Sequence, residues 1–144
     1  CLWSGIMEIV SNTSIMRFLS RILRPIILYL FPKADQNEKA FNKIVMNVIA
    51  NILGLGNAAT SLGIQAIEEL QKDNLNKDIL SDNMMMLIVL NTASLQIIPT
   101  TVIAIRTAFG SDNPTKIIVP VWFSTICAGI VGVLITKLLI KIDK

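Results

Sequence analysis

Three long stretches of the chain contain no charged residue, and these stretches define the predicted architecture. They cover residues 44–67, 83–105 and 117–136. A helix needs roughly 20 predominantly apolar residues to cross a bilayer. The third stretch is continuous and rich in Ile and Val, and lysines follow it. With Pro114 suited to the first position of a helix, it predicts a C-terminal transmembrane helix over residues 114–142.

The first stretch is interrupted by glycines, which weaken a continuous helix. Gly54 and Gly56 lie close together in its middle, and Gly63 follows. Gly favours tight turns and destabilises helix interiors. We therefore predict a broken helix over residues 40–71, which enters the membrane and returns to the same side as a re-entrant hairpin. Non-helical backbone at membrane depth is tolerated only inside protein or beside a water-filled cavity.

Basic residues favour the re-entrant arrangement over a complete crossing. Lysines are found within residues 33–43, before the first stretch, and again within residues 137–144, after the third. Cytoplasmic flanks of membrane segments favour Lys and Arg. A complete crossing would put these two groups on opposite sides, whereas a re-entrant hairpin keeps both on one side. We therefore expect a cytoplasmic C-terminal tail, although the loop at 68–82, which would share that side, is mildly acidic.

The second stretch carries a proline and a cluster of polar residues. Ser81 and Asp82 suit the start of a helix, and Pro99 removes one backbone hydrogen bond. We predict a Pro-broken helix over residues 82–109, with polar side chains gathered before and after the break. Arg106, near its end, is expected to anchor the helix at the membrane edge, because its long stem can reach the interface.

The N-terminal segment, residues 1–32, has the pattern of an amphipathic helix that lies at the membrane interface. Arg17, Arg21 and Arg24 recur at helical spacing among apolar residues, as in surface-bound helices. Pro25 and Pro32 bracket a short apolar piece. Together the segments predict one all-α integral membrane domain over residues 1–144, with the broken-helix hairpin and about two to three spanning helices.

Composition agrees with a membrane domain and disfavours most chemistry. Of 144 residues, 53% are hydrophobic and 16% are charged, and the net charge is +3. The Lys and Arg residues flank apolar runs and form no basic stripe, so nucleic acid is not an expected partner. The chain has no His, and its cysteines are Cys1 and Cys127. Because no buried stretch holds paired carboxylates or an activated nucleophile, we expect no catalytic residue, no metal site and no cofactor, and hence no enzyme.

The interrupted stretches concentrate the candidate binding residues. Asn offers donors and an acceptor, and Thr and Ser offer hydroxyls, so these groups suit a small neutral polar solute or an ion held by carbonyls and hydroxyls. We predict that they line one cavity between the two interruptions. The residues are Asn47, Asn51, Gly56, Asn57, Thr60, Asn91, Thr92, Ser94, Gln96, Thr100 and Thr101. The alternative is that these side chains only hydrogen-bond helices to one another, and the pattern suits both interpretations equally.

Several segments of the chain resemble one family closely. They are MNVIANILGLGNAATSLG at 46–63, AIEELQKDN at 66–74, LNTASLQIIPTTVIAIR at 90–106 and the turn at 110–114. These segments resemble the spore maturation protein A family of nucleoside-recognition, or gate-domain, membrane proteins, and the likeness covers nearly the whole chain. Where that family usually has Pro after Ala-Ala-Thr, this chain has Ser61. Family members usually carry more membrane sequence upstream, so the resemblance implies a C-terminal part.

The resemblance also implies a cellular role. Such proteins are integral membrane proteins of endospore-forming bacteria that act in late sporulation, in dehydration of the spore core, together with a companion, spore maturation protein B. Their gate domain is similar to parts of nucleoside and ferrous-iron transporters. We therefore expect a transport or permeation component for a small polar solute or ion in the bacterial cell membrane or the forespore membrane.

Other functions fit the same resemblance. One is a membrane scaffold that assembles with the companion, or with further copies of itself, in the lipid bilayer and transports nothing. Another is a regulator that binds a nucleoside.

Overall fold

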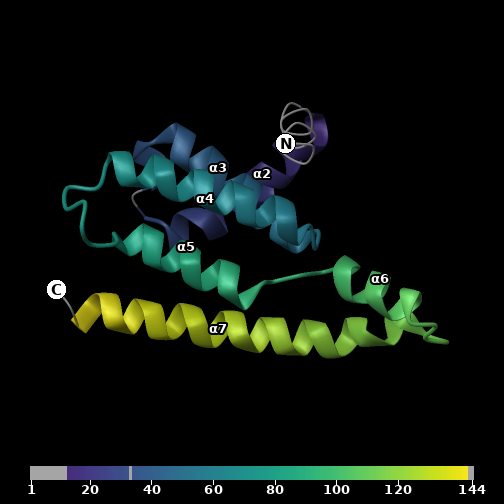
Figure 1. Ribbon diagram of the computed structural model, residues 1–144. Helices are drawn as coiled ribbons and strands as arrows, with labels where there is room; N and C mark the ends of the chain where they lie inside the picture. The colour runs from purple at the N-terminus through teal and green to yellow at the C-terminus, as the bar shows by residue number, and fades with distance from the viewer. Residues whose placement is uncertain (1–12, 33, 143–144) are drawn as a thin grey trace.

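The computed structural model describes residues 13–32 and 34–142, and every regular element among them is helical (Figure 1). This confirms the all-α prediction for the described part of the chain. The helices are α2 (Ser14–Leu30), α3 (Glu38–Ile52), α4 (Gly56–Lys72), α5 (Asp82–Ala93), α6 (Thr100–Ala108) and α7 (Ile118–Ile142), with 3₁₀ turns η1 (Ala34–Gln36) and η2 (Pro114–Ile117).

The predicted interruption in the first charge-free stretch is present, and it turns the chain back on itself. Helix α3 begins behind Asn37, whose side chain accepts a hydrogen bond from the Ala40 backbone N–H. It ends at a short turn around Gly54, which has a φ of +71°. Such a left-handed conformation is accessible to Gly without the steric cost that other residues meet. Helices α3 and α4 therefore form a tightly packed hairpin.

The second interruption is also present, but it starts earlier than Pro99 alone would require. Helix α5 ends at Ala93, and Ser94 adopts a left-handed φ of +48°. Residues 95–99 are non-helical, and α6 begins behind Pro99. Proline restricts the residue before it to extended conformations, which explains residue 98 but not the earlier end. The earlier end follows from a contact with α3 described below.

Helix α7 is the longest of the described helices, and α5 packs along it. In Figure 1, α5 lies along its C-terminal half and α6 lies beside its N-terminal half. Gly129 and Gly132 permit close approach, because a Cβ at these positions would lie 3.0 Å from a Leu95 methyl and 2.8 Å from a Val89 methyl. Small residues serve this purpose between membrane helices.

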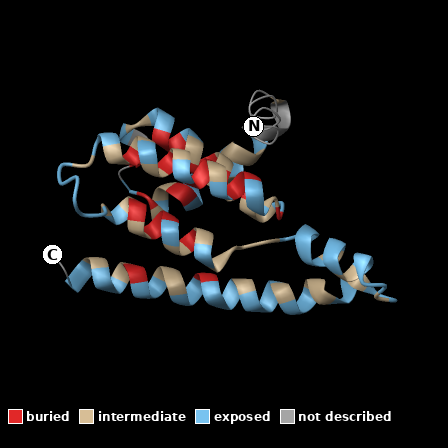
Figure 2. Ribbon diagram, viewed as in Figure 1, coloured by how far each residue is buried: buried red, intermediate tan, exposed pale blue. Residues whose placement is uncertain are grey.

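Length and composition identify one candidate membrane span within the described residues. It is the continuous helical segment Pro114–Ile142, of 29 residues, and its most apolar window is only 6% buried. Figure 2 shows the same contrast, with buried residues concentrated in α2 to α5 and exposed residues along α6 and α7. Of the about two to three spanning helices that we predicted, the described residues thus contain one candidate, by length and composition alone.

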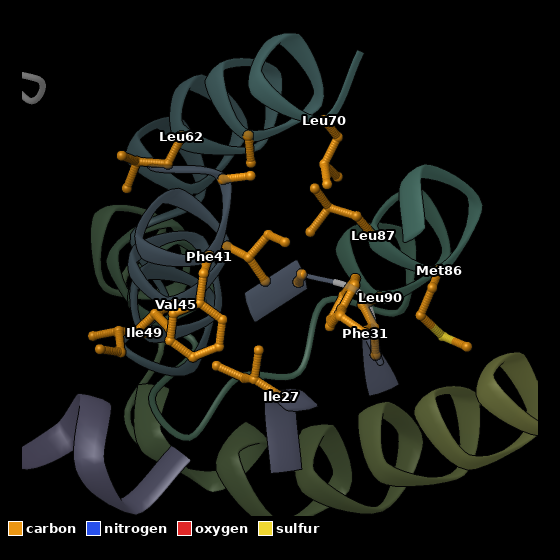
Figure 3. Packing of buried hydrophobic residues seen from close by; sticks show 14 of the residues in the cluster. Ile27, Phe31, Phe41, Val45, Ile49, Leu62, Leu70, Met86, Leu87 and Leu90 are labelled. Atoms are coloured by element: carbon orange, nitrogen blue, oxygen red, sulfur yellow. The ribbon is translucent and has the colours of Figure 1, made fainter. Parts of the chain in front are cut away.

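The buried core joins α2 to the hairpin and to α5. Ile27 of α2 and Phe31, which follows α2, pack among Phe41 and Ile49 of α3 and Leu87 of α5 (Figure 3). Burying such side chains stabilises a fold by about 1.5–3 kcal/mol each. The core thus fixes the hairpin against α5, which is what positions the polar residues of the next section.

Helix α2 differs from its expected outline. It continues through Pro25 to Leu30, so Pro25 does not separate an independent apolar piece. Beyond its buried face, it exposes a stripe made by Phe18, Ile22, Ile26 and Tyr29. These spacings of three and four residues mark one helix face. The interfacial location of the segment stays a prediction, and its residues 1–12 lie outside the described part.

Candidate functional site

The two interruptions meet and satisfy each other's backbone. The Ile97 N–H donates to the Ile52 carbonyl at 2.9 Å, and the Thr100 hydroxyl donates to the Gly54 carbonyl at 2.7 Å. The last carbonyls of a helix lack partners within the helix, and here the α5–α6 segment supplies them. This contact explains why α5 ends early, because the backbone after Ala93 bonds across to α3 instead of continuing its own helix.

Gly54 makes the close approach possible. A Cβ on Gly54 would lie 1.9 Å from the Ile98 carbonyl oxygen, far inside any normal contact. On the other side, the Trp122 indole N–H of α7 donates to the Ile97 carbonyl at 2.6 Å. The crossing therefore joins α3, the α5–α6 segment and α7 at one place.

A chain of asparagines runs from this crossing into the helix interface. The Asn47 amide N–H donates to the Ala59 carbonyl of α4 at 2.6 Å. The Asn51 amide N–H₂ donates to the Asn47 backbone carbonyl at 3.2 Å and to the Asn91 side-chain oxygen at 2.7 Å. Because backbone carbonyls only accept, these bonds fix which end of each side-chain amide is nitrogen. The amides of Asn47, Asn51 and Asn91 thus link α3 to α4 and to α5.

Gly63 provides the room that these amides occupy. A Cβ at Gly63 would lie 2.7 Å from the Asn91 amide nitrogen and 3.0 Å from the Asn47 amide nitrogen. Asn47 is 1% exposed, and its side-chain oxygen is buried without a hydrogen-bond partner. Leaving a buried acceptor unpaired typically costs about 1–3 kcal/mol. An unpaired oxygen among other amides is therefore costly to stability at this position.

A cavity of about 320 Å³, open to the surface, lies beside the asparagines between α4 and α5, and Ile64 in its wall is 55% exposed. Its walls combine polar residues with Gly63 and three isoleucines, and no charged residue lines it. The lining residues are Asn51, Gly56, Ala59, Thr60, Gly63, Ile64, Ile67, Ile88, Asn91, Thr92 and Ser94. The cavity therefore combines neutral hydrogen-bonding groups with an apolar wall.

The structure brings together part of the predicted site and separates the rest. Among the predicted residues, Asn51, Gly56, Thr60, Asn91, Thr92 and Ser94 line the cavity. Asn47 lies buried behind it, within the amide chain. The remaining four are absent from its lining: Asn57 is exposed at the start of α4, Gln96 bonds to Ser94, Thr100 holds the crossing and Thr101 is exposed on α6.

Sequence reasoning missed the apolar wall of the cavity. Gly63, Ile64 and Ile67 follow Thr60 at the three- and four-residue spacing of one helix face. A helical projection started from Thr60 would have found them. Asn57 lies three residues before Thr60, at the edge of the same face, but it is exposed in the first turn of α4 and is absent from the lining.

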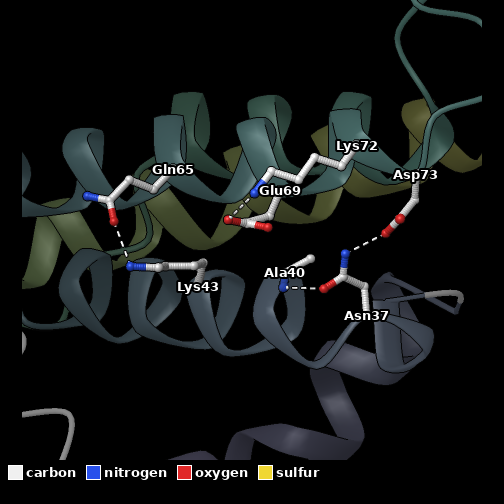
Figure 4. Close-up of polar contacts among 7 residues, drawn as sticks. All are labelled: Asn37, Ala40, Lys43, Gln65, Glu69, Lys72 and Asp73. Atoms are coloured by element: carbon white, nitrogen blue, oxygen red, sulfur yellow. Dashed lines mark hydrogen bonds and ion pairs between the residues drawn. The ribbon is translucent and has the colours of Figure 1, made fainter.

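Other polar contacts of the hairpin lie toward its open end, away from the crossing. The Lys43 ammonium donates to the Gln65 side-chain oxygen at 2.6 Å, and Asn37 bonds to Asp73 (Figure 4). Arg106 bonds to the Ser111 hydroxyl at 3.1 Å, in the turn between α6 and η2. Arg106 is thus remote from the cavity lining, and its role as a membrane-edge anchor stays a prediction.

Comparison with known proteins gives a consistent family assignment. The family described as "Gate: Nucleoside recognition" matches residues 1–111, which include both interruptions and the whole cavity lining. Spore maturation protein A of Bacillus subtilis (strain 168) is 40% identical over 135 residues, which make up 94% of this chain and 69% of that protein. No solved structure shows significant similarity to the chain.

Proposed function

Because the chain belongs to the spore maturation protein A family and to the Gate, or nucleoside-recognition, family, we propose that it is a gate for a small polar solute or ion in the membrane of the sporulating cell. The family assignment supports a sporulation-related membrane protein. The transport role, the solute and the companion subunit are the parts that we add.

The depth of the crossing supports this role. The segment Pro114–Ile142 is about 40 Å long at 1.5 Å per residue, enough to cross a hydrocarbon core of about 30 Å. Gly129 lies near its middle and packs on Leu95, immediately after α5 ends. If α7 spans the bilayer, the second break lies within the hydrocarbon core, between the levels of Trp122 and Gly129, and transporters built from interrupted helices bind their substrates at such breaks.

The orientation of the hairpin supports re-entry. A pocket lined by Asn37, Asp73 and Ser81 joins both ends of the α3–α4 hairpin to the start of α5. The start of α5 in turn lies beside the C-terminal end of α7, since Leu80 and Ile142 line a common groove. The hairpin therefore opens toward the C-terminal end of α7, and its tip bonds to the α5–α6 segment, which Trp122 joins to α7 within the candidate span.

One observation carries the proposal: the two helix breaks bond to each other beside a cavity with polar walls, within the length of the candidate span, and Trp122 of α7 bonds to the second break. Irregular backbone at membrane depth is tolerated where protein or a water-filled cavity satisfies it. A simple membrane anchor has no need of such an arrangement.

Solute flux into liposomes tests the proposal. We expect the reconstituted protein to raise the flux of a small polar solute, and Asn51→Ala or Asn91→Ala to abolish the increase. Asn57→Ala is the matched control, since Asn57 is on the same hairpin but outside the cavity lining. Flux that is equal in all four proteins at normal folding would refute the site, and an absence of flux in the wild-type protein would refute transport.

A scaffold without transport is the second candidate, and the amide bonds across helices favour it. Asn51 joins α3 to α5, and such interhelical bonds contribute about 0.6–2 kcal/mol. In that case the same variants would lose assembly with the companion subunit, measured by co-purification, while the wild-type protein moves no solute.

A further inference from the structure

We propose that the cavity selects a small uncharged solute with an N–H donor beside a C=O acceptor, as in amides and ureas, and rejects ions. This inference rests on the proposed function, because it takes the cavity as the solute site. It follows from which polar atoms the asparagines leave unpaired, and from the absence of charge in the lining.

After the hydrogen bonds of Asn51 and Asn91 form, the Asn51 side chain still has an acceptor available and the Asn91 side chain still has a donor available. Asn51 uses its amide nitrogen in both of its bonds, so its side-chain oxygen keeps its accepting capacity. Asn91 accepts through its oxygen, and its amide nitrogen has no partner among the described residues. Both residues line the cavity. The two side chains thus form an open amide pair that a solute with the complementary edge can close.

The hydroxyl groups of the lining add little donor capacity. Thr60 donates to the Gly56 carbonyl at 3.0 Å, and Thr92 donates to the Ile88 carbonyl at 2.9 Å. A hydroxyl has one hydrogen, so Thr60 and Thr92 present only lone pairs to the cavity, whereas Ser94 accepts from the Gln96 amide and keeps its hydrogen. An anion would find few donors and no cation there, and its desolvation would not be compensated.

A cation is disfavoured for a different reason. Hard cations take six or more oxygen ligands, and they gain most from carboxylates, which the lining lacks. The Asn91 amide nitrogen also carries the positive end of its dipole. Asn91 cannot turn over to present its oxygen without losing its bond to Asn51.

The apolar wall completes the selection. Ile64, Ile67 and Ile88 face the same cavity as the open amide pair, and they suit the hydrocarbon or planar part of a neutral solute. Gly63 leaves the amides their space, because a Cβ there would press on the Asn91 nitrogen at 2.7 Å. Selection therefore depends on the Asn91 donor, the Asn51 acceptor and the absence of a side chain at Gly63.

Two variants test the inference in proteoliposomes of the whole chain. Asn91→Asp keeps the oxygen that accepts from Asn51 but removes the unpaired donor, and Gly63→Ala pushes the same amide from behind. Asn57→Asp is the control for added charge. Swelling measured by stopped-flow light scattering gives the flux of urea and acetamide, and fluorescent indicators give that of Na⁺ and phosphate. Circular dichroism and gel filtration verify folding.

We expect urea and acetamide flux at least three times that of empty liposomes, background rates for both ions, and loss of the increase in Asn91→Asp and Gly63→Ala but not in Asn57→Asp. Na⁺ or phosphate flux above that of the amides would overturn the amide selectivity and leave the gate function standing. Amide flux that survives both cavity variants would overturn the role of the open pair. If none of the four solutes moves, the gate function itself is wrong.

Discussion

Replacement of Gly54 by Ala gives the sharpest test of the crossing between the two helix breaks. Gly54 has a φ of +71°, and a Cβ added to it would meet the Ile98 carbonyl oxygen at 1.9 Å. Ordinary contact begins near 3.4 Å, so the two backbones must separate by about 1.5 Å. That separation breaks the hydrogen bonds that join the interruptions.

The expected loss of stability can be assembled from its parts. An L-residue in the left-handed region costs roughly 1–2 kcal/mol. Each of the two bonds across the crossing, at Ile52 and at Gly54, contributes about 0.5–1.5 kcal/mol. We therefore expect Gly54→Ala to lower the free energy of unfolding by about 2–5 kcal/mol.

Two other glycines separate these contributions. Gly110 has a similar φ of +73° with nothing within 4 Å of an added Cβ, so Gly110→Ala should cost only the conformational part. Gly56 has an ordinary φ and equally open surroundings, so Gly56→Ala should be neutral or stabilising by up to about 1 kcal/mol, as for Ala over Gly in helices.

Unfolding of the three variants in one detergent, followed by circular dichroism, measures these differences. The order of stability should be Gly56→Ala, then Gly110→Ala, then Gly54→Ala. If Gly54→Ala and Gly110→Ala differ by less than about 0.5 kcal/mol, the spread of ordinary surface substitutions, the close approach of the two backbones is wrong.

Three further measurements address other contacts. Trp122→Phe removes the indole hydrogen bond to the α5–α6 break and should lower unfolding stability by about 0.5–1.5 kcal/mol; unchanged stability would mean that α7 does not hold the break. Cys127 is exposed on α7 near its middle, so in a Cys1→Ser background a charged maleimide should not label it in liposomes but should label it after denaturation. Rapid labelling of intact liposomes would contradict a membrane-spanning α7. Asn51→Ala and Asn91→Ala should be non-additive by about 0.5–1.5 kcal/mol in a double-mutant cycle, because they share one bond; additive losses would deny that bond.

Local residue chemistry made the helix breaks predictable. Gly54 and Pro99 act on their own backbone, through a left-handed φ and a missing N–H, so the interruptions could be located from sequence. The end of α5 at Ala93 could not, because it depends on the bond from Ile97 to α3, a partner distant in sequence. Pro25 did not break α2, whose other residues pack on the core.

The residues that line the cavity were only partly predictable, because a turn separates α3 from α4. The three non-helical residues 53–55 change the phase of the helix face, so the face that carries Asn47 and Asn51 in α3 cannot be extended into α4 by counting. Thr60 lines the cavity, whereas Asn57, three residues earlier in the exposed first turn of α4, is absent from the lining. The predicted amides Asn51 and Asn91 line the cavity, whereas the predicted amide just beyond the turn, Asn57, does not.

The hydrogen bonds shared between the two breaks make them mechanically interdependent. Neither segment can move away from the other without breaking the hydrogen bonds that satisfy the Ile52 and Gly54 carbonyls and the Ile97 N–H. Loosening at this junction is then an all-or-none event, with amide hydrogens on both segments exchanging in concert.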